Sequence, residues 1–418
     1  QIPAPVQRFE TGPGLQAQMD YSTYTIDFSG EGRRRVHLFS YVLSYSRRQY
    51  LRFVESQDFT TTIREHVRAF EYLGGVAATC LYDNMKVVVT RYEGGEPVYN
   101  TRFLAFGTLM DLSIVGVQRG EAERVSQLVE QDFAFMHRAW HAWEPGPMGR
   151  VNRLLAEGKR FAAPPSILPL LRKSKELSER SGNLFDPAVG HLVDLWGFHT
   201  DAPECRPPPD SRDIDALVKA SPRMRDIEIE GIMLRSSNPS VKLDFGAIGK
   251  GYGIDLAIAH LRELGIHNAI INAGGDLRAI GDRSGQPWRI AIRSPSGGVF
   301  AILKVAGDES VFTSGDYERN FIYEGRTYHH IIDPRTGRPA EGTRSVTVVH
   351  SDATTADAAA TALFVAGPEL WHQTATALGI RFVLLIDADG DVHMNPAMAE
   401  RVELLHKDAQ IRISPPLA

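Results

Sequence analysis

Hydrophobic and polar positions near the start of the chain follow patterns that predict a short α/β segment. β-Branched and aromatic residues gather in Met19–Phe28 and in Val36–Tyr45, as is typical of strands. From about Thr61 to Leu73, apolar residues recur on one helical face. Val76–Tyr82 then has the continuous apolar character of a buried strand. The predicted order is therefore two strands, one helix and a further strand.

A longer pattern of strands and helices begins near Asn100. The run Phe103–Val117 is apolar enough to predict one strand. Two later stretches, Ala122–Ala139 and Ser166–Ser181, have the apolar spacing of helices that bury one face. From Val241 onward the predicted order is strand, glycine-rich turn, helix and strand. This second part of the chain is thus a mixture of helices and strands.

Length and composition favour a globular protein with two domains. The chain has 418 residues, of which 43% are hydrophobic and 23% charged, and these ordinary fractions exclude disorder. A chain of this length is expected to form two or three domains. Two glycines and a proline within residues 94–97 indicate a turn or linker. We therefore expect one domain at residues 1–100 and another at residues 101–418.

Charge, hydropathy and cysteine content exclude several classes of protein. The formal net charge of −5 does not indicate a nucleic-acid-binding protein. No apolar stretch reaches about 18 residues, so we expect no transmembrane segment. Cys80 and Cys205 are too few for a disulfide framework and have no paired zinc-site spacing. We see no export signal at the start of the sequence, and the location of the protein stays open.

Two aspartates in the first domain lie where a metal-dependent nuclease would need them. Asp20 falls within a predicted strand and Asp83 at the end of another, so both could converge over one sheet to hold Mg²⁺. The runs Gln16–Tyr21 and Leu81–Lys86 make the segment similar to the catalytic core of integrase-type transposases of insertion sequences. The resemblance covers about Phe9–Thr90. It implies two of the three acids with which that family holds two metal ions.

The third acid of that family has no clear counterpart here. Gln118 stands near the expected spacing, whereas Glu121 and Glu123 open a predicted helix of the next domain, where acids favour the helix dipole. Arginines and tyrosines within residues 33–53 could contact phosphates, or form the charged outer face of an ordinary strand. We expect a truncated, inactive transposase fragment with a partial RNase H-like α/β segment, and we do not expect it to bind DNA.

The most informative run of the second domain is Val241–Asp255. Its first residues predict a strand, four glycines follow within eight residues, and a helix then extends to about Leu264. Such a turn brings backbone N–H groups close to phosphate oxygens, and Lys250 adds a positive charge. The spacing matches neither common glycine motif for phosphates, so a purely structural turn is the alternative.

A carboxylate and a hydroxyl share one helical face further along the chain. Asp357 and Thr361, within Ala356–Leu363, are four residues apart and therefore project from the same side of a helix. Oxygen atoms of these two types are suitable ligands for Mg²⁺. The alternative is an acid at a helix start, followed by a threonine that bonds to its own helical turn.

Several separated runs, taken together and in this order, resemble the ApbE family of FAD:protein FMN transferases. The resemblance covers about Thr101–Ser414. It implies an α+β transferase fold with FAD in a cleft, a required Mg²⁺, and protein flavinylation, in which FMN is joined to a Thr or Ser of an acceptor flavoprotein. The runs that carry the resemblance are Val241–Asp255, Asn272–Asp276, Thr313–Asp316, Tyr328–Gly337 and Ala356–Leu363.

The resemblance also implies a set of site residues. The family usually has Met where this chain has Phe106, which is a mild departure beside the flavin. For the metal, the resemblance implies the Ala247 carbonyl together with Asp357 and Thr361. In an alternative alignment, Ile332 takes the family position that is assigned here to Ile331. Residues at FAD-contacting positions of the family are Phe106, Trp143, Leu184, Phe185, Asp186, Asp244, Lys250 and Ile331.

The residue that removes a proton from the acceptor hydroxyl has two candidates. His330 titrates near neutral pH and could act as the base, or it could be a structural histidine in the turn before Asp333. Asp316 is the rival base. Two other functions stay open: a transposition-derived DNA-binding protein with a passenger flavin-binding domain, and an FAD pyrophosphatase in which water replaces the acceptor hydroxyl.

Overall fold

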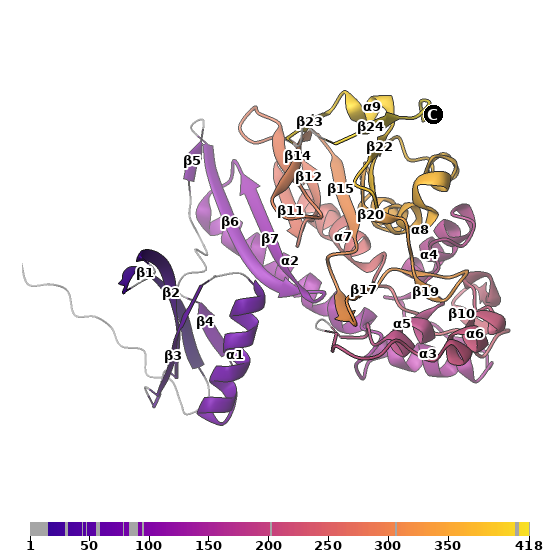
Figure 1. The fold of residues 1–418 in the computed structure, drawn as a ribbon, viewed down its shortest axis with the longest axis horizontal. Coiled ribbons are helices and arrows are strands. Elements are labelled where there is room, and N and C mark those ends of the chain that lie inside the picture. The colour runs from indigo at the N-terminus through magenta and orange to yellow at the C-terminus, as the bar shows by residue number, and fades with distance from the viewer. Residues whose placement is uncertain are drawn as a thin grey trace, which may run out of the picture. The chain divides into compact units, whose positions relative to one another are not determined.

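The chain forms two compact units, Gln1–Val89 and Thr90–Ala418 (Figure 1). The boundary lies before the expected position near Asn100, because strand β6 runs unbroken through that residue from Glu96 to Ala105. The computed structural model describes residues 16–29, 32–43, 45–46, 48–55, 59–77, 79–82, 91–93, 96–200, 203–305, 307–405 and 409–417.

The first unit contains a four-stranded sheet with one helix packed against it (Figure 1). Strand β1 pairs antiparallel with β2 and parallel with β4, which gives the order β3-β2-β1-β4. Alternate side chains of the strands bury against helix α1, so the predicted strands and helix are confirmed. The elements are β1 (Gln16–Phe28), β2 (Gly32–Leu43), β3 (Gln49–Val54), α1 (Phe59–Leu73) and β4 (Thr79–Tyr82).

The structure describes only one of the two aspartates on which the transposase resemblance depends. Asp20 lies on β1 opposite Ser40, and its neighbour Met19 pairs with Tyr82 at the end of β4. Asp83 lies outside the described residues. Arg33 and Arg34 are exposed, and Arg34 pairs with Glu55 at 2.7 Å, so at these two positions the arginines form a charged outer surface. The RNase H-like assignment stays a prediction.

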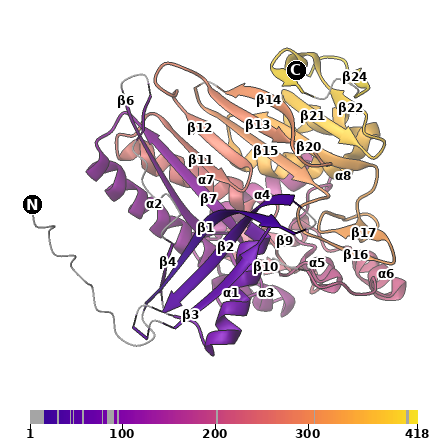
Figure 2. The same cartoon turned by 60° about the vertical axis from the view of Figure 1, so that its left-hand side comes forward.

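The second unit is built on a ten-stranded sheet in the order β24-β22-β21-β20-β15-β12-β11-β7-β6-β5 (Figures 1 and 2). Side chains alternate between two cores, one on each face of the sheet. Its strands are β5 (Arg91–Glu93), β6 (Glu96–Ala105), β7 (Thr108–Val115), β11 (Ala269–Ala273), β12 (Asp276–Ile280), β15 (Glu309–Gly315), β20 (Thr343–His350), β21 (Phe382–Asp387), β22 (Val392–Met394) and β24 (Ile411–Ile413).

Helices cover one face of this sheet and a small second sheet covers the other (Figure 2). The helices α2 (Arg119–Trp140) and α4 (Leu168–Arg180) confirm the two helices predicted between residues 122 and 181. Helix α8 is kinked at Gly367, which has a φ of 70° and directly precedes Pro368. The helices on the sheet are α2 (Arg119–Trp140), α7 (Gly249–Glu263) and α8 (Ala353–Leu378), and the small sheet has β13 (Trp288–Arg293), β14 (Val299–Val305) and β23 (Val402–Leu404).

Shorter elements complete the second unit; α3, α5, α6 and β10 lie together at the lower right of Figure 1, whereas α9 lies at the top near the C-terminus. Within the described part of the chain, no helix is both long and apolar enough to span a membrane. These elements are α3 (Pro147–Ala156), β8 (Phe161–Ala162), α4 (Leu168–Arg180), α5 (Gly190–Trp196), α6 (Ser211–Ala220), a 3₁₀ helix (Met224–Asp226), β9 (Ile227–Glu230), β10 (Met233–Ser236), β16 (Asn320–Tyr323), β17 (Arg326–His329), β18 (Ile332–Asp333), β19 (Arg338–Pro339) and α9 (Pro396–Ala399).

The run expected to form one strand at Phe103–Val117 is a hairpin instead. Strand β6 ends at Ala105 and β7 starts at Thr108, so the loop contains only Phe106 and Gly107. Their φ angles are 53° and 68°, and a two-residue turn with both φ values positive is the one that matches the twist of paired strands. The apolar pattern continues through the turn because Phe106 faces the cavity described below.

The prediction of a strand at the start of Val241–Asp255 is also wrong. The segment makes a single bridge, from Lys242 to Val189, and Leu243 is held by a side chain. Asn152 donates its Nδ2 hydrogen to the Leu243 carbonyl at 2.9 Å and accepts the Leu243 N–H at 2.7 Å. These two bonds satisfy the backbone groups of Leu243, and the N–H groups of Lys242 and Asp244 donate to the backbone carbonyls of Ala188 and Pro187. The segment therefore leaves the sheet and runs beside the cavity.

Candidate active site

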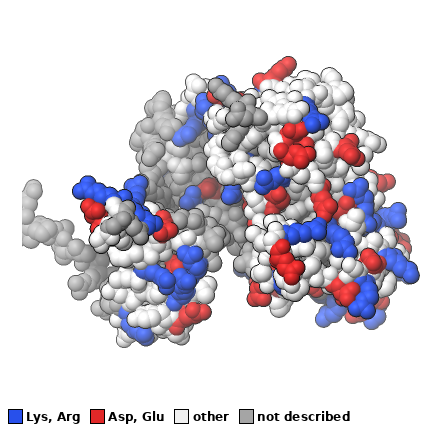
Figure 3. Space-filling view, in the orientation of Figure 1, with Lys and Arg blue, Asp and Glu red and all other residues white. Residues whose placement is uncertain are grey.

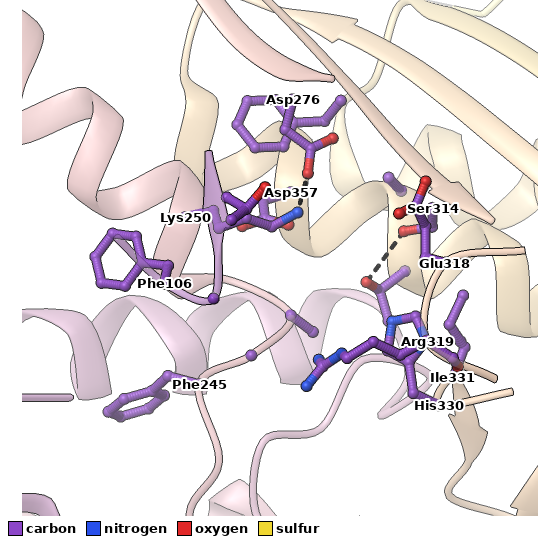
Figure 4. Close-up of a pocket in the computed structure, with 18 of the residues that line it drawn as sticks. Phe106, Phe245, Lys250, Asp276, Ser314, Glu318, Arg319, His330, Ile331 and Asp357 are labelled. Carbon is purple, nitrogen blue, oxygen red and sulfur yellow. Dashed lines mark hydrogen bonds and ion pairs between the residues drawn. The ribbon is translucent and has the colours of Figure 1, made fainter. Parts of the chain in front are cut away.

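A cavity of about 640 Å³ opens in the second unit, where the glycine-rich start of α7 meets β15 and α8 (Figure 4). It brings together all but one of the site residues named from the sequence; Asp316 is the exception. Figure 4 shows Lys250, Asp276 and Asp357 grouped together, with Arg319 and His330 on another side. The cavity-lining predicted residues are Phe106, Trp143, Leu184, Phe185, Asp186, Asp244, Ala247, Lys250, His330, Ile331, Asp357 and Thr361.

A lysine and two aspartates form the charged part of the cavity. The Lys250 ammonium pairs with the carboxylate of Asp276, and Asp357 lies close enough to act on the lysine charge. Burial alone would lower the pKa of Lys250, but the charges of Asp276 and Asp357 raise it. The ammonium is therefore charged at neutral pH. Sequence reasoning gave Asp276 no role, although its run after a buried strand was part of the family resemblance.

Asp357 is a buried carboxylate in the second turn of α8. Its side chain is 5% exposed, and Oδ2 accepts the N–H of Gly251 at 2.8 Å. Burial raises the pKa of Asp357 to about 7, although the Lys250 charge opposes that rise. A Cβ atom at Gly251 would lie 2.2 Å from the Ala353 carbonyl oxygen. Only glycine therefore allows α7 and α8 to approach closely enough for this bond.

The oxygen atoms near Asp357 fit a magnesium ion. Thr361 lies one turn after Asp357, its hydroxyl is 3.4 Å from that of Ser314, and Ala247 lines the same cavity. Among the described residues, no group of three or more His, Cys, Asp and Glu could hold a metal ion. The donors here are instead a carboxylate, a hydroxyl and a carbonyl, all hard oxygen ligands of the type Mg²⁺ takes. A cation would also offset the cost of burying the Asp357 charge.

An aromatic group forms another wall of the cavity. The rings of Phe106 and Trp140 stack with centroids 5.9 Å apart and planes 7° from parallel. The N–H of Phe106 donates to His137 Nδ1 at 3.2 Å, which holds the hairpin turn against α2. A Cβ atom at Gly253 would come within 2.9 Å of the Phe106 ring, so this second glycine also serves packing. Trp140 was missed because its helical spacing resembles that of an ordinary core residue.

Trp143 also lines the cavity, but within a different cluster. The Lys242 ammonium lies 4.2 Å from the centre of the Trp143 ring, a distance typical of a cation–π contact. His199 packs against the same ring at 5.5 Å between centroids, and both Lys242 and His199 pair with Asp194. The flat ring is therefore fixed by neighbours that the sequence pattern did not indicate.

Asp186 and Asp244 both use their carboxylates to shape backbone turns. Asp186 accepts the N–H groups of Ala188 and Met224 at 3.0 and 3.1 Å. Burial raises the pKa of Asp186 to about 6, and these bonds counteract the rise. Asp244 accepts the N–H of Gly246 at 2.7 Å. The two aspartates hold the segments that carry Phe185 and Ala247 against the cavity.

The imidazole of His330 lines the cavity. Its Nδ1 lies 3.2 Å from the Arg319 carbonyl oxygen, which can only accept, so Nδ1 carries the hydrogen and Nε2 has a lone pair. Burial and then the Arg319 charge hold the pKa of His330 well below its usual range. The imidazole is thus neutral at pH 7. The same bond is also what a structural histidine would make, so the geometry is consistent with both predicted roles.

The structure does not bring Asp316 to this cavity. Asp316 lines a separate cavity of about 510 Å³, and its carboxylate pairs with Arg344 at 3.3 Å. The residues on either side of it, Gly315 and Tyr317, do line the first cavity. Asp316 is directed away because the chain turns at the end of β15. Glu318 and Arg319, which follow in that turn, line the first cavity and were not named from the sequence.

The sequence profile of the ApbE family matches residues 106–384 of this chain. The chain belongs to the ApbE family. An FAD:protein FMN transferase of Rhodobacter capsulatus is 43% identical over 312 residues, which are 73% of this chain and 59% of that protein. The chain therefore spans less than two thirds of that relative. A Vibrio cholerae FAD:protein FMN transferase is 36% identical over 235 residues, 55% of this chain and 69% of that protein.

Solved ApbE structures have the fold of the second unit. The crystal structure of an ApbE protein from Thermotoga maritima superposes with a TM-score of 0.66 at 29% identity, over 73% of this chain and 99% of that one. The flavin transferase ApbE from Vibrio cholerae gives a TM-score of 0.64 at 28% identity, with the same coverage. The predicted ApbE-type fold is therefore confirmed. The profile match begins at residue 106 and does not test the assignment of the first unit.

Proposed function

We propose that this chain is an FAD:protein FMN transferase. It transfers FMN from FAD to a Thr or Ser hydroxyl of an acceptor flavoprotein, requires Mg²⁺ and releases AMP. The printed names of the relatives support the reaction type. Within the chain, one observation carries the proposal: the cavity combines a stacked aromatic wall with a half-buried lysine and two buried carboxylates.

The two kinds of surface in the cavity correspond to two parts of FAD. The isoalloxazine ring is flat and largely apolar, and the stacked rings of Phe106 and Trp140 offer a matching wall. The pyrophosphate is doubly negative, and Lys250 and Arg319 supply positive charge. Asp357, Thr361 and the Ala247 carbonyl would hold Mg²⁺ beside Lys250. When bound, that ion would neutralise charge on the phosphate oxygens.

In the proposed reaction, residues of this chain accept the hydroxyl proton and stabilise the leaving group. The acceptor oxygen attacks the phosphorus of the FMN half, and the bond from that phosphorus to the AMP oxygen breaks. The hydroxyl proton passes to Nε2 of His330, which is neutral and therefore able to accept it. Lys250 stabilises the negative charge that grows on the departing AMP. The products are the FMN-modified acceptor and AMP.

A direct experiment separates this reaction from FAD hydrolysis. Purified protein is incubated with FAD, Mg²⁺ and a candidate acceptor, and the acceptor is analysed by mass spectrometry. A gain of one FMN on a Thr or Ser, with an equal amount of AMP released, is the expected result. Release of both FMN and AMP while the acceptor mass stays unchanged would favour the FAD pyrophosphatase alternative.

For the first unit we propose a truncated transposase core that takes no part in the transfer and does not bind DNA. The support is limited to the sequence resemblance and the observed order β3-β2-β1-β4 with one helix. Deletion of residues 1–89 should leave the transfer rate within about twofold of that of the full chain, because the second unit has its own cores. A rate loss of about tenfold or more in soluble, folded protein would contradict this assignment.

A further inference from the structure

The start of helix α8, which carries Asp357, is held by a carboxylate from another helix. Asp255 of α7 accepts the N–H groups of Ala353 and Thr354 at 2.9 and 2.8 Å, and its Oδ2 also accepts the Thr354 hydroxyl at 2.5 Å. A helix leaves its first four N–H groups without partners inside the helix. Here a residue 98 positions earlier in the sequence satisfies two of them.

The other two N–H groups have partners at the N-cap of the helix itself. Asp352 accepts the Thr355 N–H through its side chain at 2.7 Å, and the Asp352 N–H donates to His350 Nδ1 at 3.0 Å. The first turn of α8 thus has a complete set of partners. Half of that set comes from Asp255, so the position of the turn depends on α7 as well as on its own cap.

Asp255 and Gly251 are four residues apart on α7 and therefore share one face of that helix. Gly251 donates to Asp357 at 2.8 Å, and a Cβ atom on it would lie 2.8 Å from the Asp357 Cβ. The same face of α7 therefore contacts α8 at two levels, at residues 353–354 and at residue 357. A shift of the first contact displaces the second.

A buried arginine fixes Asp255 in turn. Arg278 of β12 pairs with Asp255 and also with Asp308, at 2.9 Å to Oδ1 and 3.0 Å to Oδ2. The side chains of Arg278 and Asp255 are 11% and 17% exposed, whereas Asp308 is 38% exposed and also pairs with Arg262. Arg278 therefore has two acidic partners, of which only Asp255 touches α8.

We propose that Asp255 is a positioning residue for the metal site: by holding the first turn of α8 against α7, it places the Asp357 carboxylate beside Lys250 and Thr361. This inference rests on the proposed function, because the metal is the one that function requires. Asp255 itself does not contact the cavity, so its effect is transmitted through the helix start. Outer residues that orient metal ligands commonly change metal affinity about 10–100-fold when replaced.

The test measures Mn²⁺ binding by electron paramagnetic resonance, with the full chain and without FAD. In Asp255→Asn the size is kept, but the charge and one acceptor are lost, and the amide N–H₂ faces the N–H groups of α8. The Mn²⁺ dissociation constant should rise by about tenfold or more. Asp308→Asn is the matched control: it removes the other partner of Arg278 without touching α8, and should change the constant by less than about twofold.

The outcomes separate positioning from general loosening of the fold. A tenfold rise in Asp255→Asn beside a small change in Asp308→Asn supports the proposal, even if both variants melt at lower temperature. Equal constants in wild-type protein and Asp255→Asn, or equal rises in the two variants, would overturn it. If wild-type protein binds no Mn²⁺, both the metal site of the proposed function and this inference fail.

A milder variant keeps the proposal testable if Asp255→Asn does not fold. Thr354→Val removes one hydroxyl donor to Asp255 and leaves both backbone bonds in place. The Mn²⁺ dissociation constant should then rise by about threefold, because one of the three hydrogen bonds between Asp255 and the start of α8 is lost. An unchanged constant in Thr354→Val would count against a role for Asp255.

Discussion

Asp186 and Asp357 line the same cavity and are both buried, yet their carboxylates have different surroundings. Asp186 accepts two backbone N–H groups and lies 4.0 Å from Arg223, so its oxygens already have partners in the protein. Asp357 accepts one N–H group, from Gly251, and otherwise lies near Lys250 and Asp276. Burial raises the pKa of both groups, to about 6 and about 7.

The comparison shows what distinguishes a structural carboxylate from one available to a ligand. Burial alone does not separate them, because the two residues are 6% and 5% exposed. The difference lies in how many lone pairs the protein itself has already used. We therefore expect Asp186 to stabilise the fold and Asp357 to take part in the reaction.

The largest effect should come from Asp357→Ala. The loss of a charged Mg²⁺ ligand should reduce FMN transfer by about a hundredfold or more, while the protein stays folded. Single-turnover transfer rates give the measurement, and circular dichroism checks the fold. Near wild-type rates at ordinary Mg²⁺ concentrations would show that Asp357 is not a metal ligand. The proposed difference in role between Asp357 and Asp186 would then be wrong.

Replacement of Lys250 tests the positive partner of Asp357. Lys250→Met keeps the apolar stem and removes the charge, so turnover should fall about tenfold or more, since 1.4 kcal/mol already gives tenfold. Lys250→Arg should restore only part of the rate, because a planar guanidinium replaces a compact ammonium. FAD affinity, measured by fluorescence quenching, should also weaken. Unchanged rate and affinity in Lys250→Met would show that the lysine serves only to pair with Asp276.

The affinity for metal should depend on pH in a direction set by Asp357. Because burial raises the pKa of Asp357 to about 7, the carboxyl group is increasingly protonated below that pH. Mg²⁺ binds the carboxylate, so the apparent affinity should fall about tenfold per pH unit below pH 7 and level off above about pH 8. Mn²⁺ titrations between pH 5.5 and 8.5 check this. A flat profile below pH 7 would mean that Asp357 is already ionised there.

Asp186→Asn should have the smallest effect on the reaction. The amide keeps the oxygen that accepts both N–H groups but loses the charge beside Arg223 and places an N–H₂ group there, so the free energy of unfolding should fall by about 1–3 kcal/mol. The transfer rate per folded molecule should stay within about twofold, because Asp357 and Lys250 are untouched. Urea unfolding and single-turnover rates are measured side by side. A tenfold weaker FAD affinity with unchanged stability would instead support the FAD contact implied by the family resemblance.

Much of the cavity could be predicted because its residues lie in short runs of distinctive composition. Lys250, Asp357 and Thr361 are in such runs, and the structure brings them to one cavity. The helices at α2, α4 and α7 followed from apolar spacing.

Figure 3 shows basic and acidic side chains interspersed on the visible face of the second unit, in keeping with the modest net charge.

Other features depend on contacts that no local pattern records. Trp140 lies in a helix with ordinary core spacing, and only the turn at Phe106 places a ring against it. Asp316 is in a motif whose neighbours line the cavity, but the chain turns at that residue and directs it elsewhere. The expected strand before Gly246 fails because Leu243 bonds to the Asn152 side chain, while the groups on either side of it bond to the backbone of residues 187–190. Each of these depends on a partner far away in the sequence.

The bond between Asn152 and Leu243 has a consequence for how the protein folds. Its two partners are 91 residues apart, so it forms only after a long loop has closed. Contacts of this separation form slowly compared with a hairpin such as β6–β7. The wall of the cavity that carries Ala247 is therefore expected to form after local hairpins, together with other distant pairings such as β7 with β11. A chain that has formed only its local hairpins has no complete cavity.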